Sequence, residues 1–343
     1  MVKTNMKKKI RIGIMGFGRI GRNLFRLGYD NPLFDFVVIS DLGEPEAMHY
    51  LLMRDSVYGT MTEDVKLDGN YLKVRHQNTR LLEGGKPGSI PWDAYGVDFV
   101  LDATGKYHHR ADLQAHIDEG AKRVVVAIPP VDAVDRIVIA GINDDEIEAH
   151  DKLISVTSST TQVLALMVKM LDEKYGVERA MMTSIHAYTS DQPLADAVRS
   201  DLRRSRSAVE NIIPNDNESP RLVSELMPKF KGKLDGMALN VPVPDGSCVD
   251  LSTELRNMPS VQELNAAIKS YADSSLKGIV GYTDDPIVSS DVSGTSETMI
   301  FDGQATMITQ GKLLKTLCWY DNGWSFSKRI LELIEAYSKL EVK

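Results

Sequence analysis

The chain has 343 residues, 43% of them hydrophobic and 26% charged, with a formal net charge of -8. This length exceeds the ~250 residues at which a single core usually stops growing, so we expect two domains. The composition excludes disordered and collagen-like classes, and the negative charge argues against nucleic acid as the main partner. No apolar run reaches the ~20 residues of a membrane span, and residues 1–9 lack the apolar segment of a signal peptide, which predicts a cytoplasmic protein.

The first half of the chain alternates short β-rich runs with helical segments. Residues 10–15 are predicted as a strand, 16–21 as a glycine turn and 22–29 as a helix. Alternation of this kind predicts a doubly wound, Rossmann-type parallel sheet with a ligand crevice at the carboxyl ends of its strands. The later elements are strands over 36–40, 98–102 and 123–127 and a crossover helix over 111–120.

The glycine turn carries the strongest motif. Gly16, Gly18 and Gly21 form the pattern Gly-x-Gly-x-x-Gly between a predicted strand and a predicted helix. Glycines there permit a tight turn and let backbone amides approach a pyrophosphate. Asp41 follows 20 residues after Gly21 at a strand end, where a carboxylate can bond a ribose hydroxyl and would repel the extra phosphate of NADP. The context predicts NAD binding over the alternative of a glycine turn without a ligand.

The second half reads as an α+β domain. A helix is predicted over 161–175, and an amphipathic helix over 325–338 closes the chain. The stretch 190–235 is poor in periodicity and rich in Asp, Arg, Ser and Pro, which predicts a long excursion. The strands of a mostly antiparallel sheet are predicted over 179–184, 236–243, 248–255 and 306–320.

Cysteine usage excludes two classes of site. The chain has two cysteines, Cys248 and Cys318, and both lie within apolar, strand-like runs without metal-ligand spacing. This pattern predicts two buried free thiols in place of a disulfide framework or a zinc site. Neither is placed like a nucleophile, and no metal site is predicted.

Four further segments resemble the glyceraldehyde-3-phosphate dehydrogenase family, in family order and at family spacing. They read Ser-Ser-Thr-Thr-Gln at 158–162, Ile-His-Ala-Tyr-Thr at 185–189, Asp-Leu-Arg-Arg at 201–204 and Trp-Tyr-Asp-Asn at 319–322. With the glycine turn, the resemblance covers essentially the whole chain.

The resemblance implies an NAD-binding domain over 1–157, on which a C-terminal helix at 323–343 packs back. It implies a catalytic domain over 158–322, in which the excursion at about 190–235 is the interface loop of a homotetramer. The family's Asp-Asn-Glu-Trp-Gly-Tyr reads Asp-Asn-Gly-Trp-Ser-Phe here, so the surroundings of the nicotinamide are altered. Beyond the glycine turn and Asp41, the resemblance implies further cofactor contacts. Arg19 and Ile20 contact the pyrophosphate, Asn322 contacts the nicotinamide carboxamide, and Thr104 and Gly105 also line the cofactor site.

The catalytic positions of the family fall on Ser159, where the family has cysteine, and on His186, the base. A serine hydroxyl is far less nucleophilic near neutral pH than a thiolate. One alternative is an acyl ester on Ser159 activated by His186, as in serine hydrolases. Another is that His186 removes a proton from a hydrated aldehyde or an alcohol while NAD accepts hydride and Ser159 donates a hydrogen bond. The third alternative is that Ser159 was introduced by engineering in place of the nucleophilic cysteine.

The site for the substrate's own phosphate is altered. By resemblance it is formed by Thr189, Asp191 and Asn240, where the family has two threonines and an arginine. A carboxylate at short range repels a phosphate, and the neutral Asn240 removes the bidentate cation. A solvated Asp191 is the alternative.

At the site for inorganic phosphate, Ser158, Thr160 and Arg204 remain at positions similar to the family's donors. Asn217 and Glu218 replace the family's Thr-Gly pair, which removes one donor and adds a negative charge. Some capacity to bind an anion is therefore expected to persist.

Three functions remain open on the sequence. The first is an NAD-dependent oxidoreductase acting on an altered aldehyde, oxo or hydroxy substrate without cysteine-based acyl transfer. The second is the parent phosphorylating dehydrogenase with a substituted nucleophile. The third is a catalytically inactive NAD-binding or interaction protein, against which the retained His186 and glycine turn argue.

Overall fold

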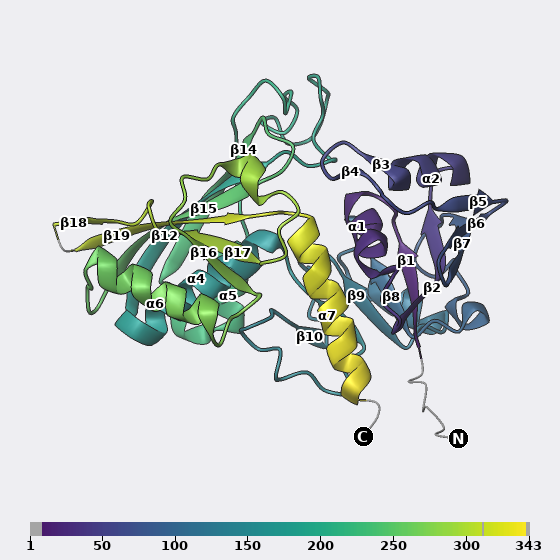
Figure 1. Cartoon of the computed structure of the whole chain (residues 1–343), viewed down its shortest axis with the longest axis horizontal. Helices are drawn as coiled ribbons and strands as arrows, with labels where there is room; N and C mark the ends of the chain where they lie inside the picture. The colour runs from purple at the N-terminus through teal and green to yellow at the C-terminus, as the bar shows by residue number, and fades with distance from the viewer. Residues whose placement is uncertain (1–8, 311, 341–343) are drawn as a thin grey trace. The chain divides into compact units, whose positions relative to one another are not determined.

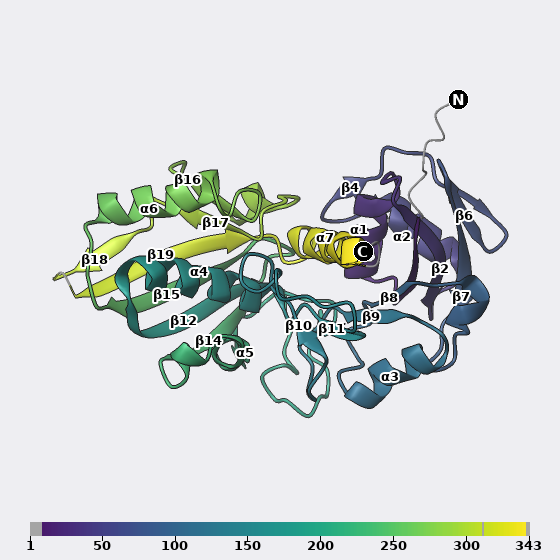
Figure 2. The same cartoon turned by 90° about the horizontal axis from the view of Figure 1, so that it is seen from below.

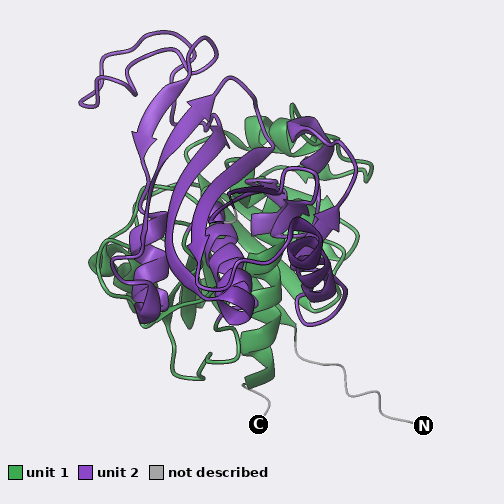
Figure 3. Ribbon diagram, turned by 90° about the vertical axis from the view of Figure 1, so that its left-hand side faces the viewer, with its two compact units in different colours: residues 1–139, 143–157, 327–343 green, residues 140–142, 158–326 purple. Residues whose placement is uncertain are grey.

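The computed structural model describes residues 9–310 and 312–340. The prediction that residues 1–9 are not a signal peptide therefore falls almost entirely outside the described residues. The chain divides into two compact units. Unit 1 comprises residues 1–139, 143–157 and 327–343, and unit 2 comprises residues 140–142 and 158–326 (Figure 3).

Unit 1 is built on a sheet of nine described strands, of which those around the glycine turn are parallel. They are β1 (Ile10–Met15), β2 (Phe34–Asp41), β5 (Lys66–Asp68), β6 (Tyr71–Val74), β7 (Gln77–Glu83), β8 (Phe99–Asp102), β9 (Arg123–Val126), β10 (Arg136–Ile137) and β11 (Leu153–Ser155). Their order is β10-β11-β9-β8-β1-β2-β7-β6-β5. Only β5, β6 and β7 pair antiparallel among these neighbours. β1 lies between β2 and β8, which confirms the predicted doubly wound sheet.

The helices of unit 1 include α1. The sequence predicted that this helix begins after the glycine turn, but it begins inside the turn, at Arg19. The last helix, α7, is the yellow helix near the C-terminus in Figure 1. It begins in unit 2, and its residues from 327 onward belong to unit 1. There Asn31 donates to Glu335 at 2.7 Å, and the Tyr337 hydroxyl donates to Asp151 at 2.8 Å. The elements are α1 (Arg19–Gly28), α2 (Pro45–Met53), α3 (Arg110–Asp118), α7 (Trp324–Leu340), the 3-10 helix η1 (Trp92–Tyr95) and the two-stranded pair β3 (Arg54–Asp55) and β4 (Gly59–Thr60).

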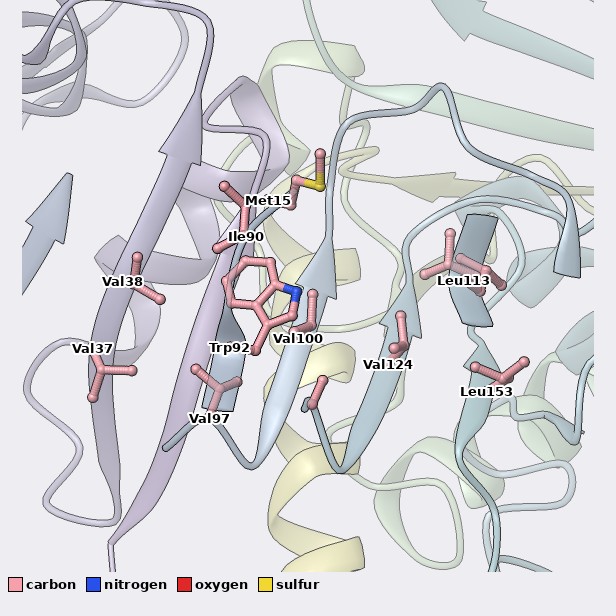
Figure 4. Close-up of a cluster of buried hydrophobic side chains, with 12 residues drawn as sticks. Met15, Val37, Val38, Ile90, Trp92, Val97, Val100, Leu113, Val124 and Leu153 are labelled. Carbon is pink, nitrogen blue, oxygen red and sulfur yellow. The ribbon is translucent and has the colours of Figure 1, made fainter. Parts of the chain in front are cut away.

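The core of unit 1 surrounds Trp92, which is fully buried. Figure 4 shows its ring among the side chains of Val38, Val97 and Val100. A Cβ on Gly13 would lie 2.7 Å from this ring, so a glycine in β1 makes room for the tryptophan. The packing therefore fixes β1, and with it the glycine turn at its carboxyl end.

Unit 2 contains a mixed sheet in which most neighbouring strands are antiparallel, as predicted. Its described strands are β12 (Val177–Ala187), β13 (Ile213–Asp216), β14 (Leu234–Val241), β15 (Ser247–Leu255), β16 (Val280–Thr283), β17 (Met299–Asp302), β18 (Met307–Thr309) and β19 (Leu313–Tyr320). Their order is β13-β14-β12-β15-β19-β17-β16, with β18 paired to β19. The pairs β12/β14 and β16/β17 are parallel.

The helices of unit 2 pack on this sheet, α4 against β15 and β12, α5 beside β14 and α6 beside β16 (Figure 2). α4 is the most buried of them: its residues 160–168, 170 and 171 are buried, and it contacts α5, β12, β15 and β19. The elements are α4 (Ser159–Tyr175), α5 (Ser219–Leu226), α6 (Val261–Asp273), η2 (Pro228–Phe230) and η3 (Ser289–Val292).

Two predictions about unit 2 were wrong in detail. The excursion at 190–235 contains β13, α5 and η2, because its segment from 213 pairs with β14 and so acquires regular structure through a distant partner. The run at 306–320 is a hairpin of β18 and β19 and not one strand, with Gln310 at a φ of 49° before the second strand.

Some features of the described residues bear on the class of protein. No helix among them is both long and apolar enough to cross a membrane. No group of three or more His, Cys, Asp or Glu side chains in the described ranges is placed to hold a metal ion. Both cysteines are buried and free, as predicted.

Candidate cofactor and active site

The glycine turn of unit 1 is shaped by close backbone contacts. Gly16 has a φ of +89°, and a Cβ there would lie 2.7 Å from the backbone nitrogen of Thr104. A Cβ on Gly21 would lie 2.1 Å from the carbonyl oxygen of Gly16. A Cβ on Gly18, in contrast, would meet no protein atom within 4 Å. The first and third glycines therefore close the turn, and the second leaves its outer side open to a ligand.

The start of α1 provides backbone donors at this open side. Gly18 is the N-cap, and no side chain caps it among the described residues. Arg19 and Ile20 are the first two helical residues. Amides at a helix start have no partner within the helix, and together with the helix dipole they favour an anion.

Asp41 lies at the end of β2, beside the turn. Its Oδ2 accepts a hydrogen bond from the Phe17 amide at 2.5 Å, and its Oδ1 accepts from the Gly43 amide at 3.0 Å. The carboxylate thus holds the turn, and it lies at the strand end where the sequence predicts contact with a ribose hydroxyl.

Thr104 and Gly105 follow β8 on the other side of β1. Asp102 orders them, because its Oδ1 accepts from the Thr104 amide at 3.0 Å and from the Thr104 hydroxyl at 2.6 Å. Behind Asp102 lies the buried His116, with its Nε2 3.5 Å from Asp102 Oδ2, and Trp92 donates to the His116 Nδ1 at 3.1 Å. Asp102 and His116 were not predicted as site residues from the sequence. An aspartate that ends a strand just before Thr-Gly was the available signal for the first.

These residues fit a dinucleotide. The turn leaves room for a pyrophosphate at Gly18, the helix start offers donors, and Asp41 stands at the next strand end. The residues predicted from the sequence to contact NAD in this unit are Gly16, Gly18, Arg19, Ile20, Gly21, Asp41, Thr104 and Gly105.

In unit 2, Ser159 is the first residue of α4. Ser158 is the N-cap, and its Oγ accepts from the Thr161 amide at 3.2 Å. The residue before it, Thr157, has a φ of 61°, a left-handed conformation that is unfavourable for a β-branched side chain. Strain of this kind persists where the surroundings hold a turn in place, and here the turn carries Ser159 half-exposed.

Tyr320 connects this turn to His186. Its buried hydroxyl bonds the Thr160 hydroxyl at 2.7 Å and the Ser184 hydroxyl at 3.3 Å. Its ring lies edge-on to the His186 ring, with centroids 6.1 Å apart. Burial raises the pKa of Tyr320 to about 12, so the hydroxyl stays protonated near neutral pH. Tyr320 was not predicted as a site residue from the sequence, although it lies in the Trp-Tyr-Asp-Asn segment.

His186 stands near the end of β12 and is half-exposed. Its Nδ1 lies 2.6 Å from the carbonyl oxygen of Ala187. Because a carbonyl only accepts hydrogen bonds, Nδ1 carries a proton, and in the neutral ring the lone pair is on Nε2. This is the tautomer that a general base with a fixed orientation requires.

Asn322 is tied to the same edge of the sheet as His186. The Ala187 amide donates to the Ser247 Oγ at 3.0 Å, and this hydroxyl donates to the Asn322 Oδ1 at 3.2 Å. The Asn322 carboxamide is therefore oriented through its oxygen, and its NH₂ group is the part suited to donate to a ligand.

The structure joins residues that the resemblance assigns to two different anion sites. Asp191 accepts hydrogen bonds from the Thr189 hydroxyl and the Arg204 guanidinium. Its charge is thus balanced by a cation, in place of the uncompensated carboxylate that the sequence suggested. Arg204 is correspondingly engaged by Asp191.

Asn217 and Glu218 lie at the start of α5. The Asn217 Oδ1 accepts from the Ser219 amide at 2.8 Å, and the Ser219 Oγ accepts from the Thr161 hydroxyl at 3.0 Å, which places Asn217 beside the start of α4. Glu218 is 64% exposed and pairs with Arg221 at 3.2 Å, so it is a solvated surface carboxylate.

Asn240 is the most informative of the altered positions. It stands in β14, in register with His186 on the parallel neighbour β12. Its side chain is 6% exposed, and its Oδ1 has no hydrogen-bond partner among the described residues. A buried amide oxygen without a partner is costly unless a ligand or water satisfies it.

A doubly wound sheet with this glycine turn and this strand-end aspartate, joined to a second unit that carries a half-exposed histidine, is typical of a dinucleotide-dependent oxidoreductase. Two family models match the chain: the NAD binding domain of glyceraldehyde 3-phosphate dehydrogenase over residues 10–110, and the C-terminal domain of the same protein over residues 158–322. The chain belongs to the glyceraldehyde 3-phosphate dehydrogenase family, whose cofactor is NAD.

Curated relatives are similar over nearly their whole length. Glyceraldehyde-3-phosphate dehydrogenase 1 of Bacillus subtilis (strain 168) is 40% identical, over 96% of this chain and 98% of the relative. The enzyme of Streptomyces coelicolor is 42% identical, over 94% and 97%. The enzyme of Geobacillus stearothermophilus is 40% identical, again over 94% and 97%.

Proposed function

We propose that the chain oxidises an aldehyde, oxo or related hydroxy substrate with NAD, without a thiol intermediate and without recognition of a terminal phosphate. The protonation of the two cysteine thiols supports the first part of this proposal, the absence of a thiol intermediate. Burial raises the pKa of Cys248 to about 12, with the carboxylates of Asp250 and Asp302 adding to the shift. Cys318 is fully buried, and burial raises its pKa well above the usual range. Neither thiol can supply a thiolate near neutral pH.

Asn240 supports the second part of the proposal. The resemblance places an arginine of the family at this position, and a guanidinium binds phosphate by two parallel hydrogen bonds. A neutral carboxamide with an unsatisfied buried oxygen instead suits a ligand that donates one hydrogen bond, such as a hydroxyl group. We therefore propose a polar, uncharged substrate group beside Asn240.

The proton step falls to His186. Its Nε2 removes the proton from the hydroxyl of an alcohol or of a hydrated aldehyde, and Ser159 Oγ donates a hydrogen bond to the same oxygen. When bound, NAD accepts the hydride from the carbon. The products are a carbonyl compound or a carboxylic acid, NADH and one proton. Tyr320 and Thr160 keep the start of α4 in place through their hydrogen bond.

A substrate screen tests this function. NAD binding is followed by fluorescence quenching, and NADH formation is followed with phosphorylated and unphosphorylated aldehydes and sugars, each with and without inorganic phosphate. We expect phosphate-independent turnover on an unphosphorylated substrate. Ser159→Cys alone is expected not to produce efficient phosphate-dependent turnover, because Asn240 and Asn217 are unchanged. Family-like turnover of glyceraldehyde-3-phosphate by that variant would contradict the proposal.

The parent activity is the second candidate, because the relatives are named as glyceraldehyde-3-phosphate dehydrogenases. The observation in its favour is the Arg204 guanidinium, which remains beside Thr189 through their shared partner Asp191. An anionic ligand could displace that carboxylate. Phosphate-dependent turnover in the same screen would select this candidate, and NAD binding without any turnover would select an inactive protein.

We also propose that the chain forms a homo-oligomer, a tetramer by resemblance. Large apolar side chains are exposed along the excursion at 190–235: Leu194 is 69% exposed, Leu202 81% and Ile212 65%. Apolar groups gathered in one loop favour burial against another protein surface. Gel filtration is expected to give a mass well above that of one chain, and a monomeric mass at micromolar concentration would remove the proposal.

A further inference from the structure

Two buried aspartates near Asn322 accept hydrogen bonds from the consecutive residues Ser293 and Gly294. The first, Asp321, is fully buried at the end of β19. Its Oδ1 accepts from the amides of Gly323 at 2.7 Å and Trp324 at 2.5 Å, and its Oδ2 accepts from the amide of Gly294 at 2.7 Å. Three backbone N–H groups thus donate to this one side chain.

The second aspartate, Asp245, lies in the turn between β14 and β15 and is 4% exposed. Its Oδ2 accepts from the Ser293 hydroxyl at 2.9 Å, whereas its Oδ1 has no donor among the described residues. The donor to Asp245, Ser293, directly precedes the donor to Asp321, Gly294, so the two carboxyl groups lie close together on one segment. Two buried carboxyl groups this close do not both ionise, and since Asp321 has the backbone donors, the proton belongs on Asp245. That proton gives the buried oxygen its partner.

The two aspartates belong to two segments that are joined by the hydrogen bond between Ser247 and Asn322. Asp245 precedes Gly246, whose φ of +79° and whose position against the Ser289 carbonyl leave no room for a Cβ. The next residue, Ser247, donates to the Asn322 Oδ1, and Asn322 itself follows Asp321. A hydrogen bond between the two aspartates therefore fixes both ends of the Ser247 to Asn322 contact.

We propose that a proton shared by Asp245 and Asp321 holds the turn that presents Asn322, which makes Asp245 a positioning residue for cofactor binding. The inference rests on the proposed function only for NAD binding, and the role of Asn322 toward the nicotinamide carboxamide is the one that the family resemblance implies. Loss of the proton places two anions in contact in a buried site. The turn then loosens, and Asn322 is no longer held in the orientation set by Ser247.

The direction of the pH effect follows from Asp245. Burial, with the Asp321 carboxylate as the next cause, raises the pKa of Asp245 to about 7, while the Ser293 hydroxyl and the Gly246 amide act in the opposite direction. The ordinary pKa of an aspartate applies in the unfolded chain. The folded protein therefore binds this proton more tightly, and the associated stability is present below about pH 4 and is lost as the pH rises to about 7.

Asp245→Asn tests the proposal, because an amide of nearly the same shape donates permanently to Asp321. The thermal midpoint and the KM for NAD are measured from about pH 5.5 to about pH 8.5 for the wild type, for Asp245→Asn and for the exposed control Asp235→Asn. For the wild type and the control, we expect the midpoint to fall on the order of 5 °C relative to Asp245→Asn as the pH rises. Their KM for NAD rises about 3- to 10-fold, with little change in kcat.

In Asp245→Asn both quantities are expected to be nearly independent of pH over this range. The inference is overturned if Asp245→Asn keeps the pH dependence of the wild type, or if it is the less stable protein at the alkaline end. The melting experiment needs no turnover. A protein that neither binds NAD nor reduces it would contradict the proposed function, and the melting curves would still decide whether the two aspartates share a proton.

Discussion

His186→Asn is expected to lower kcat for NADH formation by about 10²- to 10⁴-fold, the range that a positioned general base contributes. Asparagine can keep a hydrogen bond to the Ala187 carbonyl through its NH₂ group, but it cannot accept a proton near neutral pH. The affinity for NAD should stay within about twofold, because His186 acts on the substrate proton. Turnover is measured with the substrate found in the screen, and NAD binding by fluorescence quenching.

A matched control is His150→Asn. The His150 side chain is 78% exposed and pairs with Glu148, outside either site, so this variant should behave like the wild type. A melting curve for each variant separates loss of the base from loss of folding. If His186→Asn retained most of its turnover, the histidine would be a structural residue and the proton step would need another acceptor.

Gly21→Ala is expected to destabilise unit 1 by about 1–3 kcal/mol or more, the usual cost of forcing atoms into packed space. The added Cβ would lie 2.1 Å from the Gly16 carbonyl oxygen, which is backbone and cannot rotate away. Either the turn or the start of α1 must move. NAD affinity should fall together with the thermal midpoint, measured by fluorescence quenching and by calorimetry.

Gly18→Ala separates the two effects. A Cβ at this position meets no protein atom within 4 Å and the φ of −68° suits alanine, so stability should not change. A bound pyrophosphate would occupy that side of the turn, and we expect weaker NAD binding at an unchanged thermal midpoint. Wild-type affinity in Gly18→Ala would show that the cofactor does not approach the turn there.

The elements around the glycine turn were predictable because their signals are local. β1 and β2 are short apolar runs, Gly-x-Gly-x-x-Gly marks the turn, and Asp41 marks a strand end. Each is a property of neighbouring residues. The small strands β5, β6 and β7 were not identified, because their pairing partners, and not their composition, make them strands.

The contacts at the site in unit 2 could not be predicted in the same way. Ser247 bonds Asn322 across 75 positions, and Tyr320 bonds Thr160 across 160. Nothing in the sequence around Ser247 or Tyr320, which both lie in strand-like runs, indicates which distant residue each will bond. The ion pair of Asp191 with Arg204 was also not predictable, because it depends on how the loop after β12 folds back.

The sequence by itself determined the family, the cofactor class and the two kinds of sheet, because glycine patterns, strand periodicity and motif order are written in neighbouring residues. It also showed that serine stands where the family's nucleophile is expected. The tertiary structure alone decided which polar groups meet: Tyr320 with Thr160, Asp191 with Arg204, and Asp245 and Asp321 with the neighbouring donors Ser293 and Gly294. The physical reason is that burial and proximity set hydrogen bonds and protonation, and both arise only when distant segments pack together.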